Sequence, residues 1–118
     1  MFVPLKTGHS QEHVTAFAVR IGEELARREG ELVTMEFSKK ARGVRVYADP
    51  FRNAYLQTIV TPYSVRRRPG ATVSMPLAWD EVTARLDPRR FTVRTLERRV
   101  ASGDPWSDFK KQAQKLPV

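Results

Sequence analysis

Residues 44–77 read VRVYADPFRNAYLQTIVTPYSVRRRPGATVSMPL, and their first part alternates apolar with polar or aromatic residues. Successive side chains of a strand point to opposite faces, so the alternation predicts a strand over residues 44–49. Pro50 follows and ends the pairing. The apolar set, which we expect to face a core, consists of Val44, Val46 and Ala48.

The second part of this stretch predicts a β-hairpin. Residues 56–68 and 71–77 flank the pair Pro69-Gly70. Proline at the second position and glycine at the third position are typical of a type II turn. We therefore expect two antiparallel strands joined at this pair.

The residues before residue 44 predict one helix and two strand segments. Ser10 is placed to cap the helix and Gly30 to end it. Residues 31–37 favour a strand, and Met1–Leu5 resembles the end of a strand. The apolar face of the helix recurs at helical spacing through Val14, Phe17, Ala18, Ile21 and Leu25.

The residues after the hairpin give weaker signals. Residues 79–81 predict a short helical turn, and residues 91–102 are compatible with either a strand or a helix. Asp104-Pro105 suits the start of a terminal helix reaching about Gln114.

Length and composition favour one domain over residues 1–118. The fold class we expect is α/β (α+β), a small mixed or antiparallel sheet with helices packed on one face. Apolar residues make up 41% of the chain without a membrane-length run, and there is no cysteine. No secretory signal precedes the helix, so we expect a cytoplasmic protein without a membrane partner.

Charge is the first indication of a partner. The chain has 21 Lys and Arg against 13 Asp and Glu, a formal net charge of +8. Most of the excess falls after Ile59, which favours a polyanionic partner. The alternative is a protein that is simply basic.

Candidate metal ligands are few. Asp49 ends a strand, a common position for a carboxylate that binds a divalent cation. Its alternative role is to cap the turn at Pro50 or to pair with Arg45. His9 and His13 lie four residues apart, but no third ligand follows nearby, so we interpret them as a surface pair.

Several motif pieces occur in one order across nearly the whole chain. They are Val46-Tyr47-Ala48-Asp49, Asn53, Thr61-Pro62-Tyr63-Ser64-Val65-Arg66, Pro69-Gly70-Ala71, Val73-Ser74-Met75-Pro76-Leu77, Trp79-Asp80-Glu81 and Gly103-Asp104-Pro105-Trp106. In this order and spacing the chain resembles the C-terminal half of the primase-polymerase domain of bacterial DNA ligase D. That family belongs to the archaeo-eukaryotic primases and works in non-homologous end joining.

The resemblance implies roles for individual residues. Asp49 would be the third of three catalytic carboxylates that bind Mn²⁺ or Mg²⁺, and Arg66 would contact the triphosphate of the incoming nucleotide. Ser64 and Arg52 would also be nucleotide-binding, although Arg52 departs from the polar, uncharged residue often found at its position. A guanidinium suits a phosphate because it is always charged and binds bidentately.

The other motifs of that family have no counterpart in the chain. There is no Asp-x-Asp pair, and the Ser, Lys and His motif that handles the triphosphate is absent. Two-metal phosphoryl transfer needs several converging carboxylates. The chain therefore resembles a polymerase domain without its front half, and we expect it to be inactive alone.

Two main hypotheses about function follow. The chain is a fragment or subunit of a repair primase-polymerase, acting on DNA ends and nucleoside triphosphates with a separate N-terminal half, a ligase or a Ku-like protein. Alternatively it is a non-catalytic nucleic-acid-binding or scaffold protein, and a truncated reading frame without a role is a third possibility. An exposed strand edge predicts self-association.

Arginines and tryptophans complete the candidate set. Arg67 and Arg68 either bind nucleic-acid phosphates or form a solvated hairpin tip. Trp79 and Trp106 are interpreted as core residues. A second basic patch or an ordinary exposed helix face would contain Arg89, Arg90, Arg94, Arg98 and Arg99.

Overall fold

The computed structural model describes residues 1–117, which divide into two compact units. Unit 1 consists of Met1–Pro4 and Val60–Ala113. Unit 2 consists of Leu5–Ile59 and the described residues from Gln114 onward. Among residues 1–117, no helix is both long and apolar enough to cross a lipid bilayer. A single domain over residues 1–118 stays a prediction.

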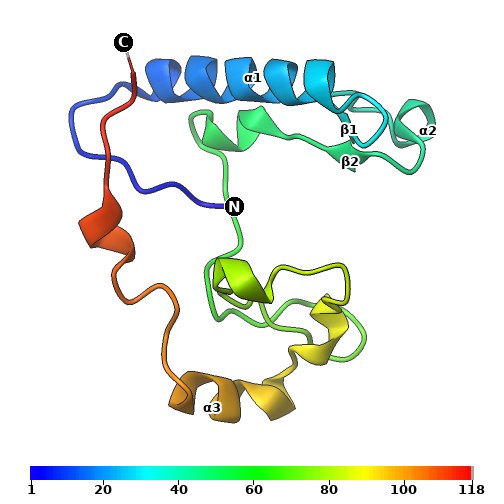
Figure 1. Ribbon diagram of the computed structural model, residues 1–118, viewed down its shortest axis with the longest axis vertical. Coiled ribbons are helices and arrows are strands. Elements are labelled where there is room, and N and C mark those ends of the chain that lie inside the picture. Colours follow the sequence, from blue (N-terminus) through cyan, green and yellow to red (C-terminus); the bar gives the residue numbers. More distant parts are fainter. Residues whose placement is uncertain (118) are drawn as a thin grey trace. The chain divides into compact units, whose positions relative to one another are not determined.

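Unit 2 is built on the helix α1, Gln11–Arg28, as the sequence predicts. The Ser10 side chain caps it by accepting a hydrogen bond from the backbone N–H of His13 at 3.2 Å. Gly22 is the buried position of the helix, and a Cβ there would lie only 3.1 Å from the sulfur of Met35. The glycine thus lets α1 lie close to the segment that follows β1 (Figure 1).

The sheet of unit 2 is small and parallel. Strand β1 is Val33–Thr34 and strand β2 is Val46–Tyr47, with Val33 opposite Val46. Between them lies the short helix α2, Lys39–Arg42. After β2 comes the 3-10 helix η1, Pro50–Asn53. Both predicted strands exist but are shorter than residues 31–37 and 44–49.

The predicted burial of the β2 segment is wrong. Val44 and Val46 are exposed, at 104% and 66%, whereas Arg45 is half-buried. The Arg45 guanidinium lies on the C-terminal end of α2 and donates hydrogen bonds to the carbonyls of Ala41 at 3.0 Å and Arg42 at 3.1 Å. The apolar side of the strand therefore has no covering element within the described residues.

Unit 1 contains the predicted hairpin and four short helices. Val65 pairs antiparallel with Val73, and Thr72 pairs with Thr92, so a third segment extends the hairpin. Gly70 has a φ of 86°, and the Ala71 N–H donates to the carbonyl of Arg68 at 3.0 Å, as the turn requires. The helices are η2 Trp79–Glu81, η3 Pro88–Arg90, α3 Val93–Ala101 and η4 Phe109–Gln112.

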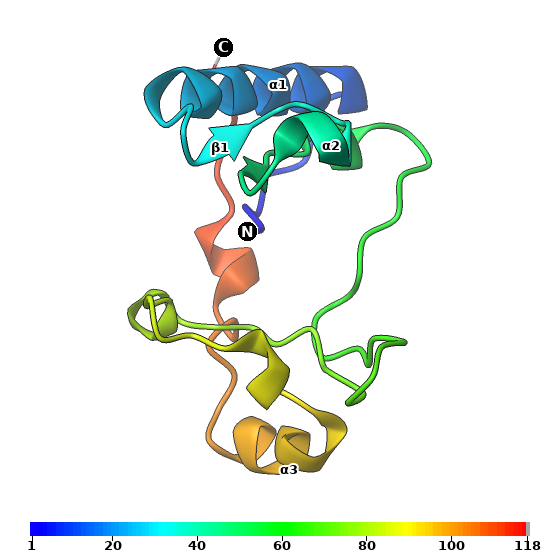
Figure 2. The same cartoon turned by 90° about the vertical axis from the view of Figure 1, so that its right-hand side faces the viewer.

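Two details of unit 1 differ from the sequence predictions. The predicted terminal helix is replaced by turns followed by η4, because the Asp104 side chain accepts the Trp106 N–H at 2.9 Å and closes a turn there. Trp79 is 76% exposed, so its interpretation as a core residue is wrong. Trp106 does pack, with Phe2 and Phe109 on its ring. The segment between 91 and 102, left open by the sequence, is largely α3 (Figure 2).

Candidate functional site

The carboxylate of Asp49 lies at the end of β2, where the chain turns into η1. Arg52 donates from Nε to Oδ2 of Asp49 at 2.9 Å. The pair is possible because Pro50 starts a 3-10 turn, which brings residues three apart together. Neither role considered as the alternative is observed: Asp49 precedes η1 without a side-chain capping bond, and its ion-pair partner is Arg52 rather than Arg45.

Contacts from α1 hold this turn in place. Thr15 donates from Oγ1 to the carbonyl of Asn53 at 2.9 Å, and Gln11 donates from Nε2 to the same carbonyl at 3.0 Å. The carbonyl belongs to the last residue of η1, so both bonds fix the helix that carries Arg52. Figure 1 shows this short helix in green beneath α1. The Asp49–Arg52 pair therefore lies at a turn that two hydrogen bonds from α1 hold in place.

The described residues do not supply a complete set of ligands for a divalent cation at Asp49. Across residues 1–117, no three side chains of His, Cys, Asp or Glu gather closely enough to hold a metal ion. Asp49 is a single carboxylate, and its Oδ2 is already engaged by Arg52. A two-metal centre needs several carboxylates to balance the charge of both ions, so Asp49 could be only one ligand among others.

The two histidines have a structural role. Their rings lie 5.4 Å apart at an angle of 73°. His9 accepts a hydrogen bond through Nε2 from the backbone N–H of Leu116 at 3.2 Å. That nitrogen is thus used to tie the end of the described chain to the start of α1, rather than left free for a metal.

Arg66 lies on the hairpin of unit 1, with the backbone well fixed and the side chain exposed. Its N–H donates to the carbonyl of Thr72 at 2.7 Å. Ser64 donates from Oγ to the carbonyl of Thr61 at 2.7 Å, so its hydroxyl proton is committed to the turn. Arg67 and Arg68 follow at the exposed tip. Within the described chain, none of these three arginines forms an ion pair.

A hydrogen bond joins two of the motif pieces within unit 1, Thr61–Arg66 and Gly103–Trp106. The Tyr63 hydroxyl donates to Oδ1 of Asp104 at 2.6 Å. Burial and this bond raise the pKa of Tyr63 to about 12, and the same bond holds the pKa of Asp104 below its usual range. Tyr63 has a φ of 62°, a costly conformation for a residue with a Cβ, so the surrounding contacts must over-determine it.

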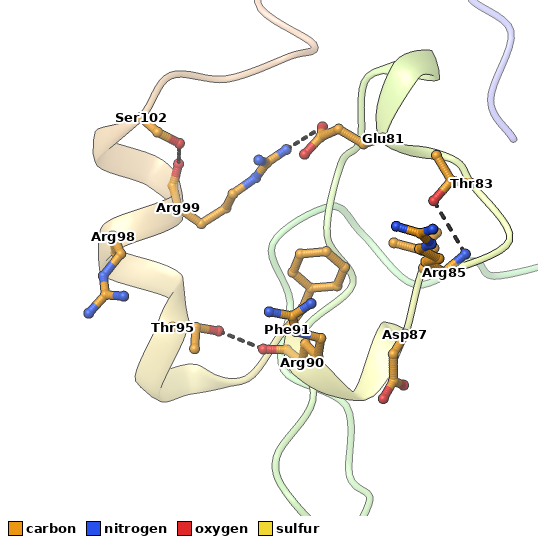
Figure 3. Close-up of a pocket in the computed structure, with 11 residues that line it drawn as sticks. Glu81, Thr83, Arg85, Asp87, Arg90, Phe91, Thr95, Arg98, Arg99 and Ser102 are labelled. Atoms are coloured by element: carbon orange, nitrogen blue, oxygen red, sulfur yellow. Dashed lines mark hydrogen bonds and ion pairs between the residues drawn. The ribbon is translucent and has the colours of Figure 1, made fainter.

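A second bond of this kind joins η2 to α3. Arg99 donates from Nη2 to Oε2 of Glu81 at 2.6 Å, and the pair is largely shielded from solvent. Hydrogen bonding to Arg99 lowers the pKa of Glu81 below its usual range. Figure 3 shows this pair bridging a hollow between α3 and the loop that follows η2.

The structure thus places the candidates in two groups. Asp49 and Arg52 lie together in unit 2, and Ser64 and Arg66–Arg68 lie together on the hairpin of unit 1. The predicted second basic patch is not uniform, since Arg89 pairs with Asp87 and Arg99 pairs with Glu81.

Sequence reasoning missed the bonding roles of Tyr63, Asp104, Glu81 and Arg99. Three of the four belong to motif pieces already quoted, Thr61–Arg66, Trp79–Glu81 and Gly103–Trp106. A tyrosine or a carboxylate within such a motif piece indicates a structural hydrogen bond as readily as a catalytic group.

Comparison with known proteins gives one consistent family. The family model described as LigD, primase-polymerase domain, matches residues 1–106. The chain is 30% identical over 119 residues to the multifunctional non-homologous end joining protein LigD of Pseudomonas aeruginosa. It is 33% identical over 120 residues to the bifunctional non-homologous end joining protein LigD of Bacillus subtilis. These alignments cover 98% and 100% of the chain but 14% and 20% of the relatives.

A solved structure agrees with the sequence relatives. The polymerase domain of Mycobacterium tuberculosis ligase D, in complex with DNA, matches with a TM-score of 0.73 and 28% identity. The match covers 93% of this chain and 38% of that chain. The chain therefore spans a minority of the length of the proteins it resembles.

Proposed function

The chain belongs to the LigD primase-polymerase domain family, and from that premise we propose that it acts in non-homologous end joining as one part of a primase-polymerase. Its contribution is to bind DNA and the phosphates of an incoming nucleotide. The remaining catalytic carboxylates come from outside these 118 residues, because the sequence holds no Asp-x-Asp pair.

The observation that carries this proposal is the family match together with the state of the hairpin arginines. Arg66, Arg67 and Arg68 are exposed on a hydrogen-bonded hairpin and have no ion-pair partner within the described residues. Unpaired guanidinium groups on a fixed backbone can bind phosphates without first breaking internal contacts. In the proposal, Arg66 binds the triphosphate, while Arg67 and Arg68 bind the nucleic-acid backbone.

Ser64 can still contribute an acceptor to a nucleotide, since the hydroxyl proton is used and the oxygen lone pairs are not. Arg52 donates to Asp49 through Nε and has other N–H groups, so it can bind a nucleotide phosphate beside the Asp49 carboxylate or in its place. Asp49 would then be free to serve as one ligand of a Mn²⁺ or Mg²⁺ ion whose other ligands this chain does not supply. A ligase or Ku-like partner stays a prediction from the resemblance.

The test is a primer-extension assay with Mn²⁺, nucleoside triphosphates and a DNA end. We expect no extension by the chain alone. Extension is expected when a polypeptide carrying the rest of a relative's polymerase domain is added, and its loss is expected with Asp49→Ala. Asp108→Ala is the matched control, because Asp108 is an exposed carboxylate of unit 1 paired only with Lys111.

Failure of Asp49→Ala to alter extension by the reconstituted complex would contradict the metal-ligand role. Absence of extension in every combination, with DNA binding retained, would instead favour a second function.

That second function is a non-catalytic nucleic-acid-binding or scaffold protein. The observation in its favour is the Asp49–Arg52 ion pair, because the arginine balances the charge of the Asp49 carboxylate without a metal ion. It also predicts that Asp49→Ala leaves DNA affinity unchanged or slightly higher, since a negative charge is removed.

A further inference from the structure

A hollow of about 580 Å³ lies within unit 1, on the side of α3 that faces η2 and η3. Four arginines and two carboxylates line it, so its wall is positively charged. The remaining lining residues are apolar or hydroxyl-bearing. The charged lining residues are Arg85, Arg90, Arg98, Arg99, Glu81 and Asp87.

Both carboxylates of this wall are already engaged. Glu81 receives Arg99 at 2.6 Å, and Asp87 receives Arg89, which does not line the hollow, at 2.9 Å. Arg85 and Arg90 have no ion pair within the described residues and are exposed. Arg98 also lines the hollow and lacks an ion pair among the described residues, but its side chain points away from Glu81 and Phe91 in Figure 3, so Arg85 and Arg90 are the unpaired guanidinium groups considered for a ligand.

The Arg99 side chain adds a donor that has no acceptor. Its Nη2 atom is held by Glu81 and by the carbonyl of Pro76 at 3.4 Å. Its Nε atom is buried and has no hydrogen-bond partner. A buried N–H without an acceptor is unfavourable, but this atom is shielded from solvent, so an acceptor in the hollow would reach it only after the Arg99 side chain moves. Figure 3 shows this side chain reaching across the hollow from α3 to Glu81.

Two of the residues that line the hollow are apolar. Phe91 and Leu86 line it, and the Phe91 ring lies beside Arg90 in Figure 3. An aromatic ring next to arginines suits a nucleotide, because the base or sugar can pack on the ring while the phosphate meets the guanidinium groups.

We infer that this hollow is a second nucleic-acid site, which binds the phosphate of one nucleotide through the exposed guanidinium groups of Arg85 and Arg90. The inference rests on the proposed function, since it takes DNA as the partner of the chain. It differs from that proposal in place, because the hollow is lined by residues 81–102 and the hairpin arginines do not line it.

Two exposed arginines make a matched test. Arg90→Gln removes a guanidinium that lines the hollow, whereas Arg94→Gln removes one that does not line it and has no ion pair within the described residues, with the same change in net charge. Arg90 contributes only backbone groups to its local hydrogen bonds, so the fold should be retained. Equal thermal denaturation midpoints of the two variants would establish this.

The measurement is the affinity of a labelled oligothymidylate for each variant. We expect Arg90→Gln to weaken binding about fivefold, because one charge-assisted phosphate contact is lost. Arg94→Gln should weaken binding less than about twofold, through the general field alone. Arg85→Gln should behave as Arg90→Gln does.

The source of the phosphate is distinguished by competition with ATP. If ATP displaces the oligothymidylate from the wild-type protein and displaces it less effectively from Arg90→Gln, the hollow takes a free nucleotide. If ATP does not compete, it takes a backbone phosphate. Both results support the inference.

Equal effects of Arg94→Gln and Arg90→Gln would overturn the inference and leave the proposed function standing. Absence of oligothymidylate binding by the wild-type protein would overturn both.

Discussion

The two units of the chain use their charged residues differently. In unit 2, Arg52 pairs with Asp49, and Arg27 and Arg28 share the carboxylate of Glu24. The pKa of Glu24 is lowered to about 2 by these two hydrogen bonds. In unit 1, the hairpin arginines Arg66–Arg68 have no ion pair within the described residues.

The absence of ion pairs at the hairpin indicates which arginines are available to a polyanion. The net charge of +8 belongs to the whole chain, but a cation held by an internal carboxylate contributes little to the field that a phosphate meets. The hairpin of unit 1, whose three adjacent arginines form no ion pair within the described chain, is therefore the part expected to bind nucleic acid. The exposed apolar side chains of unit 2 include Leu32, Phe37, Val44 and Val46.

The largest expected effect comes from removing two arginines of the hairpin tip. Arg67→Gln/Arg68→Gln should lower the affinity for single-stranded DNA about tenfold at low salt, because two phosphate contacts are lost. The matched control is Arg27→Gln/Arg28→Gln, which changes the net charge equally but removes cations already paired with Glu24. Fluorescence anisotropy measures both, and equal losses would remove the distinction between the units.

Self-association tests the apolar surface of unit 2. Apolar side chains left exposed near a strand edge favour association of chains. Val44→Lys/Val46→Lys should raise the dissociation constant of the self-associated protein about fivefold, as charge enters the contact. Sedimentation velocity over a range of concentrations is the measurement, and a wild-type protein that stays monomeric throughout would refute the expectation.

The bond between Tyr63 and Asp104 should contribute to the stability of unit 1. Tyr63→Phe removes a hydrogen bond to a carboxylate and should lower the free energy of unfolding by about 1–2 kcal/mol. Tyr55→Phe is the control, because Tyr55 is 75% exposed. Urea denaturation followed by tyrosine and tryptophan fluorescence compares them, and equal losses would show that the bond is not stabilising.

The same bond predicts a smaller effect of pH. Folding raises the pKa of Tyr63 from 10.0 to about 12, so its contribution is complete below pH 10 and declines as the pH rises toward 12. Folding lowers the pKa of Asp104 below 3.8, so that contribution is complete above pH 3.8 and declines in stronger acid. The stability difference between wild type and Tyr63→Phe should therefore be largest at neutral pH and shrink at both extremes.

How far the sequence predicts the fold depends on whether a signal is local. The cap at Ser10 and the turn at Pro69-Gly70 are confirmed, because each needs only neighbouring residues. The alternation of Val44 and Val46 correctly indicates a strand, but which of its faces is covered depends on elements distant in sequence. The pattern could not show that.

The candidate site divides in the same way. The family resemblance is confirmed, and it identifies Arg66 and Asp49 as candidates. The partner of Asp49 is Arg52 because Pro50 begins a 3-10 turn, a local geometry that alternation along the strand does not predict. The hollow beside α3 depends on Arg99 reaching Glu81 across 18 positions, and nothing in the spacing of these residues indicates it.

The most direct test of the account is the salt dependence of single-stranded DNA binding by the wild-type protein. If Arg66–Arg68, Arg85 and Arg90 each neutralise one phosphate, a plot of log affinity against log salt should have a slope of about −3 to −4. Tight binding that is lost steeply with salt would agree with free arginines in unit 1. A slope near zero, or no binding at low salt, would contradict the claim that this chain contacts nucleic-acid phosphates.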